Sequence, residues 1–407
     1  MIPSRRADGP SPALATALRL TISALGASLA VLGGVMAVIA GRLARRVVTP
    51  AVRQADTVLL GLDTNAQTVT LSRTPDTRLP GRYGLFTSGS ASYLKVGTVL
   101  SETDTAVTRK LLTHIAPDAH LSPQAAFSGW YFDQPEQLHL AYSSEAISTP
   151  VGECPAWLFP PEPDSAAQDV WVIHIHGRGT TRAEALRAVP VFHDLGITNL
   201  LVSYRNDGEA PSSRHGTYTL GATEWRDVDA AIAFARERGA RRIVLMGWSM
   251  GGAVALQLAL TSAHRESITA LILDSPAIDW GVVLRHQAGL HRLPRPLVGL
   301  TLGALGSRWA RPVRGGGEPI PFDRLDVIAR AGELRHPMLI LHSEDDGFVP
   351  ADASHELARA RPDLVALESF RTARHTKLWN FDEKRWSAAI SSWLSSVLDD
   401  PARASGS

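Results

Sequence analysis

The chain has 407 residues, a length that predicts two or three domains. Its 41 basic and 40 acidic side chains leave a formal net charge of +1, which argues against nucleic acid or any other strongly charged partner. Cys154 is the single cysteine, so no internal disulfide can form, and no cysteine and histidine cluster has the spacing of a zinc site.

The first predicted element is an apolar segment from Leu20 to Gly41 that contains no charged residue. A helix of this length extends about 33 Å, enough to cross a hydrocarbon core of about 30 Å. We therefore expect a flank over residues 1–19 and a transmembrane anchor over residues 20–41, with a cleaved signal ending near Ala40 as the alternative. The arginines before and after the segment are too evenly balanced to orient it. The expected location is a membrane, as a single-pass protein of a bacterial plasma membrane; the side of the membrane on which the rest of the chain lies stays open.

Residues 54–155 contain short β-like runs separated by Pro, Gly and Asp, which predict a small β-rich accessory region. The predicted strands are Thr57–Leu60, Thr68–Leu71, Tyr83–Phe86, Tyr93–Val96 and Leu138–Leu140, and one helix is predicted over Thr105–Ile115. No motif in this region carries recognisable chemistry. We expect it to rest on the next domain and shape the entrance to its site.

An apolar strand over Val170–Ile175 runs into His176, Gly177, Arg178 and Gly179. Glycines in such a loop allow the backbone to turn its N–H groups toward a pocket. We expect the N–H of Arg178 to be one of two donors to an oxyanion, with Gly177 and Gly179 supporting the turn and His176 bracing the loop.

The segment Gly247-Trp248-Ser249-Met250-Gly251 lies between an apolar strand and a helical pattern that starts at Gly252. This is the context of a G-x-S-x-G nucleophile elbow, a turn so tight that Gly247 and Gly251 are needed on either side. Ser249 is the predicted nucleophile, at the positive end of the following helix. The N–H of Met250 is the second predicted oxyanion donor.

Apolar strands alternate with helical patterns from residue 156 to residue 399, which predicts a mostly parallel sheet covered by helices on both faces. Within this domain a strand is expected over Asn199–Ser203 and a helix near Trp225–Gly239. The alternation is interrupted over residues 276–322, where we expect a cap insertion that is leucine-rich and basic. Such a cap suits an acyl chain with an anionic head group or contact with a membrane, and a solvated arginine-rich surface is the alternative.

Two further candidates follow the cap. Asp346, in an acidic loop after the strand Met338–Leu341, is the predicted acid that orients an imidazole; Asp345 and Asp274 are its rivals. His375, on a loop before the last helix, is the predicted base. Its competitors, His342 and His355, fit the chain order less well. The tail over residues 400–407 is expected to be disordered.

The order Ser249, Asp346, His375, together with the His-Gly-x-Gly loop and the elbow, resembles the α/β-hydrolase superfamily of serine hydrolases, which includes esterases, lysophospholipases and serine aminopeptidases. The resemblance covers residues 156–399. It implies an α/β-hydrolase fold with a cap, but a fold used so widely leaves the substrate open.

The expected function is a membrane-anchored serine hydrolase that cleaves carboxylic esters, lipid esters among them, through an acyl-enzyme and without a cofactor. The expected partners are a small-molecule or lipid acyl substrate and, through residues 20–41, the membrane; the oligomeric state stays open. A serine peptidase of the aminopeptidase kind and a thioesterase are alternatives within the enzymes. A catalytically silent binding protein on the same fold is the alternative outside them.

Overall fold

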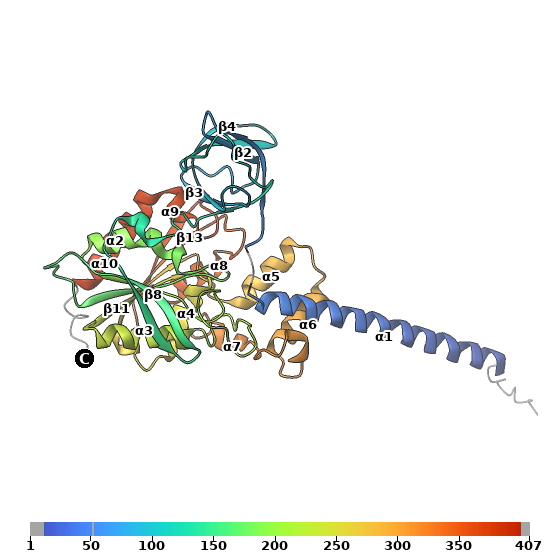
Figure 1. Cartoon of the computed structure of the whole chain (residues 1–407). Coiled ribbons are helices and arrows are strands. Elements are labelled where there is room, and N and C mark those ends of the chain that lie inside the picture. Colours follow the sequence, from blue (N-terminus) through green and yellow to red (C-terminus); the bar gives the residue numbers. More distant parts are fainter. Residues whose placement is uncertain (1–11, 51–52, 400–407) are drawn as a thin grey trace, which may run out of the picture.

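A computed structural model describes residues 12–50 and 53–399 of the chain (Figure 1). A long helix projects from a folded body, which consists of a small barrel and a larger domain with a central sheet. The predicted disorder of residues 400–407 falls outside the described residues, as does the first part of the predicted flank.

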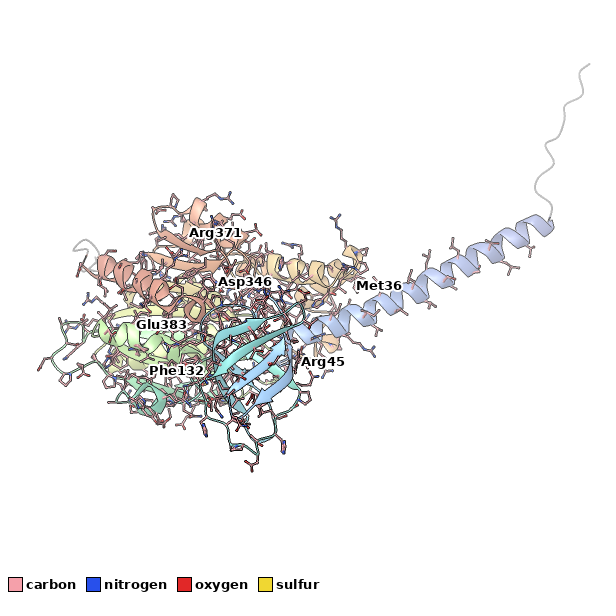
Figure 2. All side chains as sticks on the ribbon, turned by 90° about the horizontal axis from the view of Figure 1, so that it is seen from above. Met36, Arg45, Phe132, Asp346, Arg371 and Glu383 are labelled. Atoms are coloured by element: carbon pink, nitrogen blue, oxygen red, sulfur yellow. The ribbon has the colours of Figure 1, made fainter. Side chains whose placement is uncertain are left out.

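The projecting helix, α1 (Pro12–Val48), is longer than the predicted span over residues 20–41. Its part from Ser23 to Val48 is long and apolar enough to cross a membrane, a property it shares with signal sequences near an N-terminus. Only the last turns of α1 pack against the body, where Ala44 and Val48 are fully buried. Figure 2 shows Arg45 at this end of the helix, where it meets the body.

The accessory region is a closed barrel of six antiparallel strands in the order β1-β2-β5-β4-β3-β6. The strands are β1 (Thr57–Asp63), β2 (Thr68–Ser72), β3 (Tyr83–Phe86), β4 (Tyr93–Glu102), β5 (Ala106–Leu111) and β6 (Gln124–Ser128). Alternate residues of these strands, such as Val69 and Leu71, fill the barrel. Four of the predicted strands are present.

Two predictions in this region are wrong. The helix expected over Thr105–Ile115 is strand β5, because its buried positions alternate and include the charged Arg109. The strand expected over Leu138–Leu140 is instead the end of the 3₁₀ helix η1 (Pro135–Leu138), after which His139 takes a left-handed conformation with φ 54°. A strand cannot continue through that conformation.

The larger domain is built on an eight-stranded sheet in the order β14-β13-β12-β11-β9-β10-β8-β7. Its strands are β7 (Ser143–Thr149), β8 (Gly152–Phe159), β9 (Val170–Ile175), β10 (Thr198–Val202), β11 (Arg242–Trp248), β12 (Ile268–Asp274), β13 (Met338–Ser343) and β14 (Val365–Phe370). Strands β9 to β14 pair in parallel, whereas β8 pairs antiparallel with β7 and β10. The expected boundary between residues 155 and 156 therefore cuts through β8, and β7 belongs to the sheet and not to the accessory region.

Both faces of the sheet are buried, which confirms the predicted α/β architecture. In β11, Ile243 and Leu245 point into one core and Val244 and Met246 into the other. One face is covered by α3 (Trp225–Glu237), α4 (Met250–Thr261) and α8 (Asp352–Ala360). The other is covered by η2 (Arg182–Ala188), α2 (Val189–Asp194), α9 (Leu378–Phe381) and α10 (Glu383–Leu398).

The predicted cap region lies between β12 and β13. It contains α5 (Trp280–Leu290), α6 (Arg295–Gly306), the 3₁₀ helix η4 (Pro312–Arg314) and the start of α7 (Phe322–Leu325). Helices α6 and η4 lie against the body end of α1 (Figure 1). A Cβ placed on Gly41 would lie 3.0 Å from Cβ of Val313, so the small residue allows helix and cap to touch there. Two short 3₁₀ helices, η3 (Arg265–Ser267) and η5 (Ala331–Glu333), complete the domain.

Candidate active site

Ser249 occupies the turn between β11 and α4, at the carboxyl edge of the sheet. Its backbone is in a strained region, with φ 50° and ψ −112°. A side chain on Gly251 would collide with the carbonyl oxygen of Ile175, and a Cβ on Gly247 would lie 2.6 Å from the carbonyl oxygen of Gly251. These clashes explain why the turn requires glycine on both sides of the serine.

The structure brings Ser249, His375 and Asp346 together from three separate loops. Nε2 of His375 lies 3.0 Å from Oγ of Ser249, and its Nδ1 lies 2.7 Å from Oδ2 of Asp346. Because a carboxylate only accepts, Nδ1 carries the proton of the neutral ring, and Nε2 is left to accept the serine proton. This geometry can activate a hydroxyl for attack on a carbonyl carbon.

Asp346 is held as an anion by its surroundings. Burial alone would raise its pKa, but the charge of His375 and hydrogen bonds from His342 and His375 outweigh burial and hold the pKa well below its usual range. Its other oxygen, Oδ1, accepts the N–H groups of Phe348 and Val349, each at 2.8 Å. A carboxylate that stays charged can stabilise an imidazolium during the reaction.

The rival acids have other partners. Asp345 accepts the hydroxyl of Ser343 and the N–H of Arg374 through its Oδ1. Asp274 is buried and accepts Nε1–H of Trp386 at 2.9 Å.

The rival bases also lie elsewhere. His355 pairs with Glu344 on the exposed face of the domain. His342 lies behind Asp346, with Nε2 3.0 Å from the carbonyl oxygen of Val349 and 3.3 Å from Oδ2 of Asp346. Sequence reasoning considered His342 only as a base and missed this contact, which its place at the end of β13, four residues before Asp346, could have suggested.

The loop after β9 approaches Ser249 from the opposite side. Gly177 lies so close that a Cβ there would be 3.4 Å from Cβ of Ser249. Its N–H is used by Glu184, whose Oε2 accepts it at 2.8 Å. In the described part of the chain, no backbone hydrogen bond takes up the N–H of Arg178 or of Met250. Gly179 has φ 72°, which a side chain would disfavour.

His176 lies beneath this loop and is fully buried. Its ring stacks on Tyr204 with centroids 4.2 Å apart, and its Nε2 lies 3.2 Å from Oδ2 of Asp207. The hydroxyl of Tyr204 donates to the carbonyl oxygen of His176 at 2.9 Å. These contacts fix the start of the loop from below.

The side chain of Arg178 reaches the end of α1. Its Nη2 donates to the carbonyl oxygens of Arg46, at 3.1 Å, and Thr49, at 3.0 Å. The N–H of Tyr218 also donates to the carbonyl oxygen of Val48 at 2.7 Å. A cation at a helix C-terminus interacts favourably with the helix dipole. The last turn of α1 is therefore part of the framework around this loop.

Within residues 12–50 and 53–399, no group of three or more His, Cys, Asp or Glu side chains is arranged to hold a metal ion. Cys154, the single cysteine, is buried in β8, where burial raises the pKa of its thiol to about 11.

Comparison with known proteins identifies the larger domain. Residues 172–389, just over half of the chain, match the Alpha/beta hydrolase family. The chain belongs to this family. Residues 57–128, which run from the first residue of β1 to the last of β6, match a domain of unknown function (DUF8805). The alpha/beta hydrolase domain thus carries all three grouped side chains, and the barrel is a separate, recognised unit.

The chain is similar to the uncharacterized protein YqkD of Bacillus subtilis (strain 168), with 24% identity over 237 residues that cover 56% of this chain and 72% of that protein. Among solved structures, the chain resembles esterase Pf2001 of Pyrococcus furiosus, with 20% identity, 65% of this chain and 94% of that chain covered, and a TM-score of 0.50. A monoacylglycerol lipase of Paleococcus ferrophilus matches with 19% identity, 60% and 99% coverage and a TM-score of 0.44. At these identities the likeness to solved structures extends to the fold alone.

Proposed function

We propose that this protein is a membrane-anchored serine hydrolase that cleaves carboxylic esters, lipid esters foremost, through a triad of Ser249, His375 and Asp346. The observation that carries the proposal is the continuous hydrogen-bond path from the Ser249 hydroxyl through both ring nitrogens of His375 to Asp346. Membership of the alpha/beta hydrolase family supports the hydrolytic chemistry.

In this mechanism Oγ of Ser249 attacks the ester carbonyl while Nε2 of His375 takes its proton. The backbone N–H groups of Arg178 and Met250 hold the oxyanion, and each such donor contributes on the order of 3 kcal/mol to the transition state. His375 then gives its proton to the leaving alcohol, which leaves an acyl group on Ser249. Since the His375 side chain is 19% exposed, water can reach the imidazole, be activated and release the acid.

The membrane-spanning role of α1 and the surface of the cap support lipid esters as substrates. The cap exposes Leu290, Leu300, Val313 and Trp309, the last of them 95% exposed. Because Gly41 of α1 meets Val313, this part of the cap lies at the end of the proposed span. Exposed tryptophan and leucine beside arginines suit the interface of an anionic bilayer.

Turnover by the full chain in detergent micelles tests the proposal. The substrates are nitrophenyl esters from acetyl to palmitoyl, the corresponding thioesters, and aminoacyl nitroanilides, with Ser249→Ala as the control. We expect ester turnover that increases with acyl length and falls by a factor on the order of 10⁴ or more in Ser249→Ala. Turnover of the amides or thioesters without the esters would instead support a peptidase or a thioesterase. No turnover of any substrate and no reaction with a fluorophosphonate would support a binding protein.

A further inference from the structure

The loop that carries His375 is held in an unusual conformation. It connects β14 to α9, and the residues on both sides of the histidine have left-handed backbone angles, with φ 60° at Arg374 and φ 51° at Thr376. Neither residue is glycine, and for the β-branched threonine this region is a genuine outlier. Such a conformation persists only where surrounding contacts determine it.

Contacts from the hydrolase domain hold one side of the loop. The N–H of Arg374 donates to Oγ of Ser343 and to Oδ1 of Asp345, and its Nη1 donates to the carbonyl oxygen of Asp345 at 2.6 Å. The same guanidinium lies close to Gly347, where an added Cβ would be 2.3 Å from its Nη2. Since Asp345 and Gly347 flank Asp346, Arg374 ties the histidine loop to the loop that carries the acid.

Contacts from the barrel hold the other side. Oδ1 of Asp76, in the loop between β2 and β3, lies 3.1 Å from Nε of Arg374 and 3.7 Å from Nζ of Lys377. The three side chains are between 12% and 27% exposed, so solvent screens the pairs only in part. The two cations lie on either side of His375 in the sequence, so a single carboxylate of the barrel contacts the loop both before and after the histidine.

The barrel loop is itself rigidly supported. Arg109, fully buried inside the barrel, donates to the carbonyl oxygens of Thr77, Leu79 and Gly81. The end of the loop then meets the hydrolase domain, where Nδ2 of Asn380 donates to the carbonyl oxygen of Arg82 at 2.8 Å. The loop that carries Asp76 is thus held by contacts with both the barrel and the hydrolase domain.

A second contact comes from the chain just after the last barrel strand. A Cβ on Gly129 would lie 2.5 Å from the carbonyl oxygen of Thr376 and 2.7 Å from Nη1 of Arg187. The carbonyl oxygen of Gly129 accepts that same Nη1 at 2.6 Å. The exit from the barrel is therefore packed directly on the strained residue that follows His375.

We propose that the barrel is a positioning element of the active site, and that Asp76 is a positioning residue that acts on His375 through Arg374. This inference rests on the proposed function. It assigns a role to a domain of unknown function: the barrel holds the strained histidine loop so that the imidazole stays in line between Ser249 and Asp346. Without Asp76, Arg374 loses one of its two anchors and the imidazole moves away from the serine hydroxyl.

The test is Asp76→Asn in the full chain in detergent, with kcat and KM measured on the best nitrophenyl ester and normalised to sites titrated with a fluorophosphonate. A misplacement of about 1 Å can lower a rate on the order of 10²-fold. We expect kcat to fall about tenfold while KM stays within about twofold, because the loop positions the base and not the substrate. Asp76→Glu, which keeps the charge, should recover most of the loss.

Asp169→Asn is the matched control. Asp169 forms an ion pair with Arg242 through two hydrogen bonds, and the exposure of these side chains is similar to that of Asp76 and Arg374. Arg242 is the first residue of β11, so this pair lies at the opposite end of the strand from Ser249. This variant should keep the wild-type kcat. When Arg374 is already replaced by Met, adding Asp76→Asn should lower kcat by less than about twofold further, because both changes remove the same contact between Asp76 and Arg374.

The outcomes separate this inference from the proposed function. If the wild type neither turns over esters nor reacts with the fluorophosphonate, the proposed function fails. If the wild type is active and Asp76→Asn has the same kcat per titrated site, with or without a lower Tm, the barrel only adds stability and the positioning role is refuted. An equal loss of kcat in Asp169→Asn would also refute it.

Discussion

Replacing Arg178 by methionine tests whether the end of α1 supports the oxyanion loop. The change keeps the backbone N–H that we assign to the oxyanion, and it keeps an apolar side chain of similar length at this position. It removes the guanidinium, which donates to the carbonyl oxygens of Arg46 and Thr49 and lies 5.7 Å from the ring centroid of Tyr218.

The magnitude follows from these two bonds. A hydrogen bond from a charged donor contributes about 1.5 to 3 kcal/mol, and the cation at the helix end adds about 0.3 to 1 kcal/mol. Arg46 and Thr49 are exposed residues whose freed carbonyl groups can bind water, so we expect a net loss of about 2 kcal/mol in the contact between loop and helix. Complete removal of an oxyanion donor lowers kcat by a factor on the order of 10² to 10³. A donor that is present but less firmly held should lower kcat by about tenfold.

The assay compares kcat, KM and the affinity of a trifluoromethyl ketone, which binds as an oxyanion adduct of the serine. Arg178→Met should lower kcat and inhibitor affinity by about the same factor and leave KM within about twofold. Arg182→Met is the matched control, because Arg182 lies in the same connection but stacks on Trp157 at 4.2 Å. Wild-type kcat and inhibitor affinity in Arg178→Met would refute the link between α1 and the loop.

Two further outcomes follow from buried histidines. His342→Phe removes the ring whose Nε2 lies 3.3 Å from Oδ2 of Asp346 and 3.0 Å from the carbonyl oxygen of Val349, so kcat should fall by about threefold to tenfold at constant KM. In His342→Gln, whose amide can still donate at this place, kcat should fall less; equal losses in both variants would argue against a polar role of this side chain. Burial lowers the pKa of His174 to about 4, below its value of about 6.5 in an unfolded chain, so the unfolded state binds the proton first as pH falls. The stability linked to His174 is therefore complete above about pH 6.5 and lost as pH falls toward 4, by roughly 3 kcal/mol. In His174→Gln, the free energy of unfolding measured in urea should depend less on pH between about 6.5 and 4. An unchanged pH dependence would contradict this role of His174.

The features that could be predicted from the sequence are those fixed by local chemistry. The elbow around Ser249 could be predicted because its glycines are required within five residues. The sheet could be predicted because strands such as β9 and β11 consist mainly of apolar residues. The grouping of Ser249, Asp346 and His375 was predicted from their order and loop positions, and the structure brings these side chains within hydrogen-bond distance.

The remaining features depend on contacts that the sequence does not display. Strand β5 could not be predicted because Arg109, a charged residue, occupies an inward position and breaks the alternation of apolar and polar residues that marks a strand. That position is favourable only because carbonyl groups enclosed by the barrel accept hydrogen bonds from Arg109. The edge strand β7 is polar along most of its length and so lacks an apolar signal. Asp76 and Arg374 are 298 residues apart, and nothing in either segment predicts that they meet.

The mass of the intact full-length protein after reaction with a fluorophosphonate tests the central claim most directly. We predict one phosphonate adduct, located on Ser249 by peptide mapping, that forms at a rate proportional to ester turnover. His375→Ala should form the same adduct at least about 10³-fold more slowly, because the base is gone. An adduct on another residue, or labelling of Ser249 that is as fast without His375, would contradict the assignment of the triad.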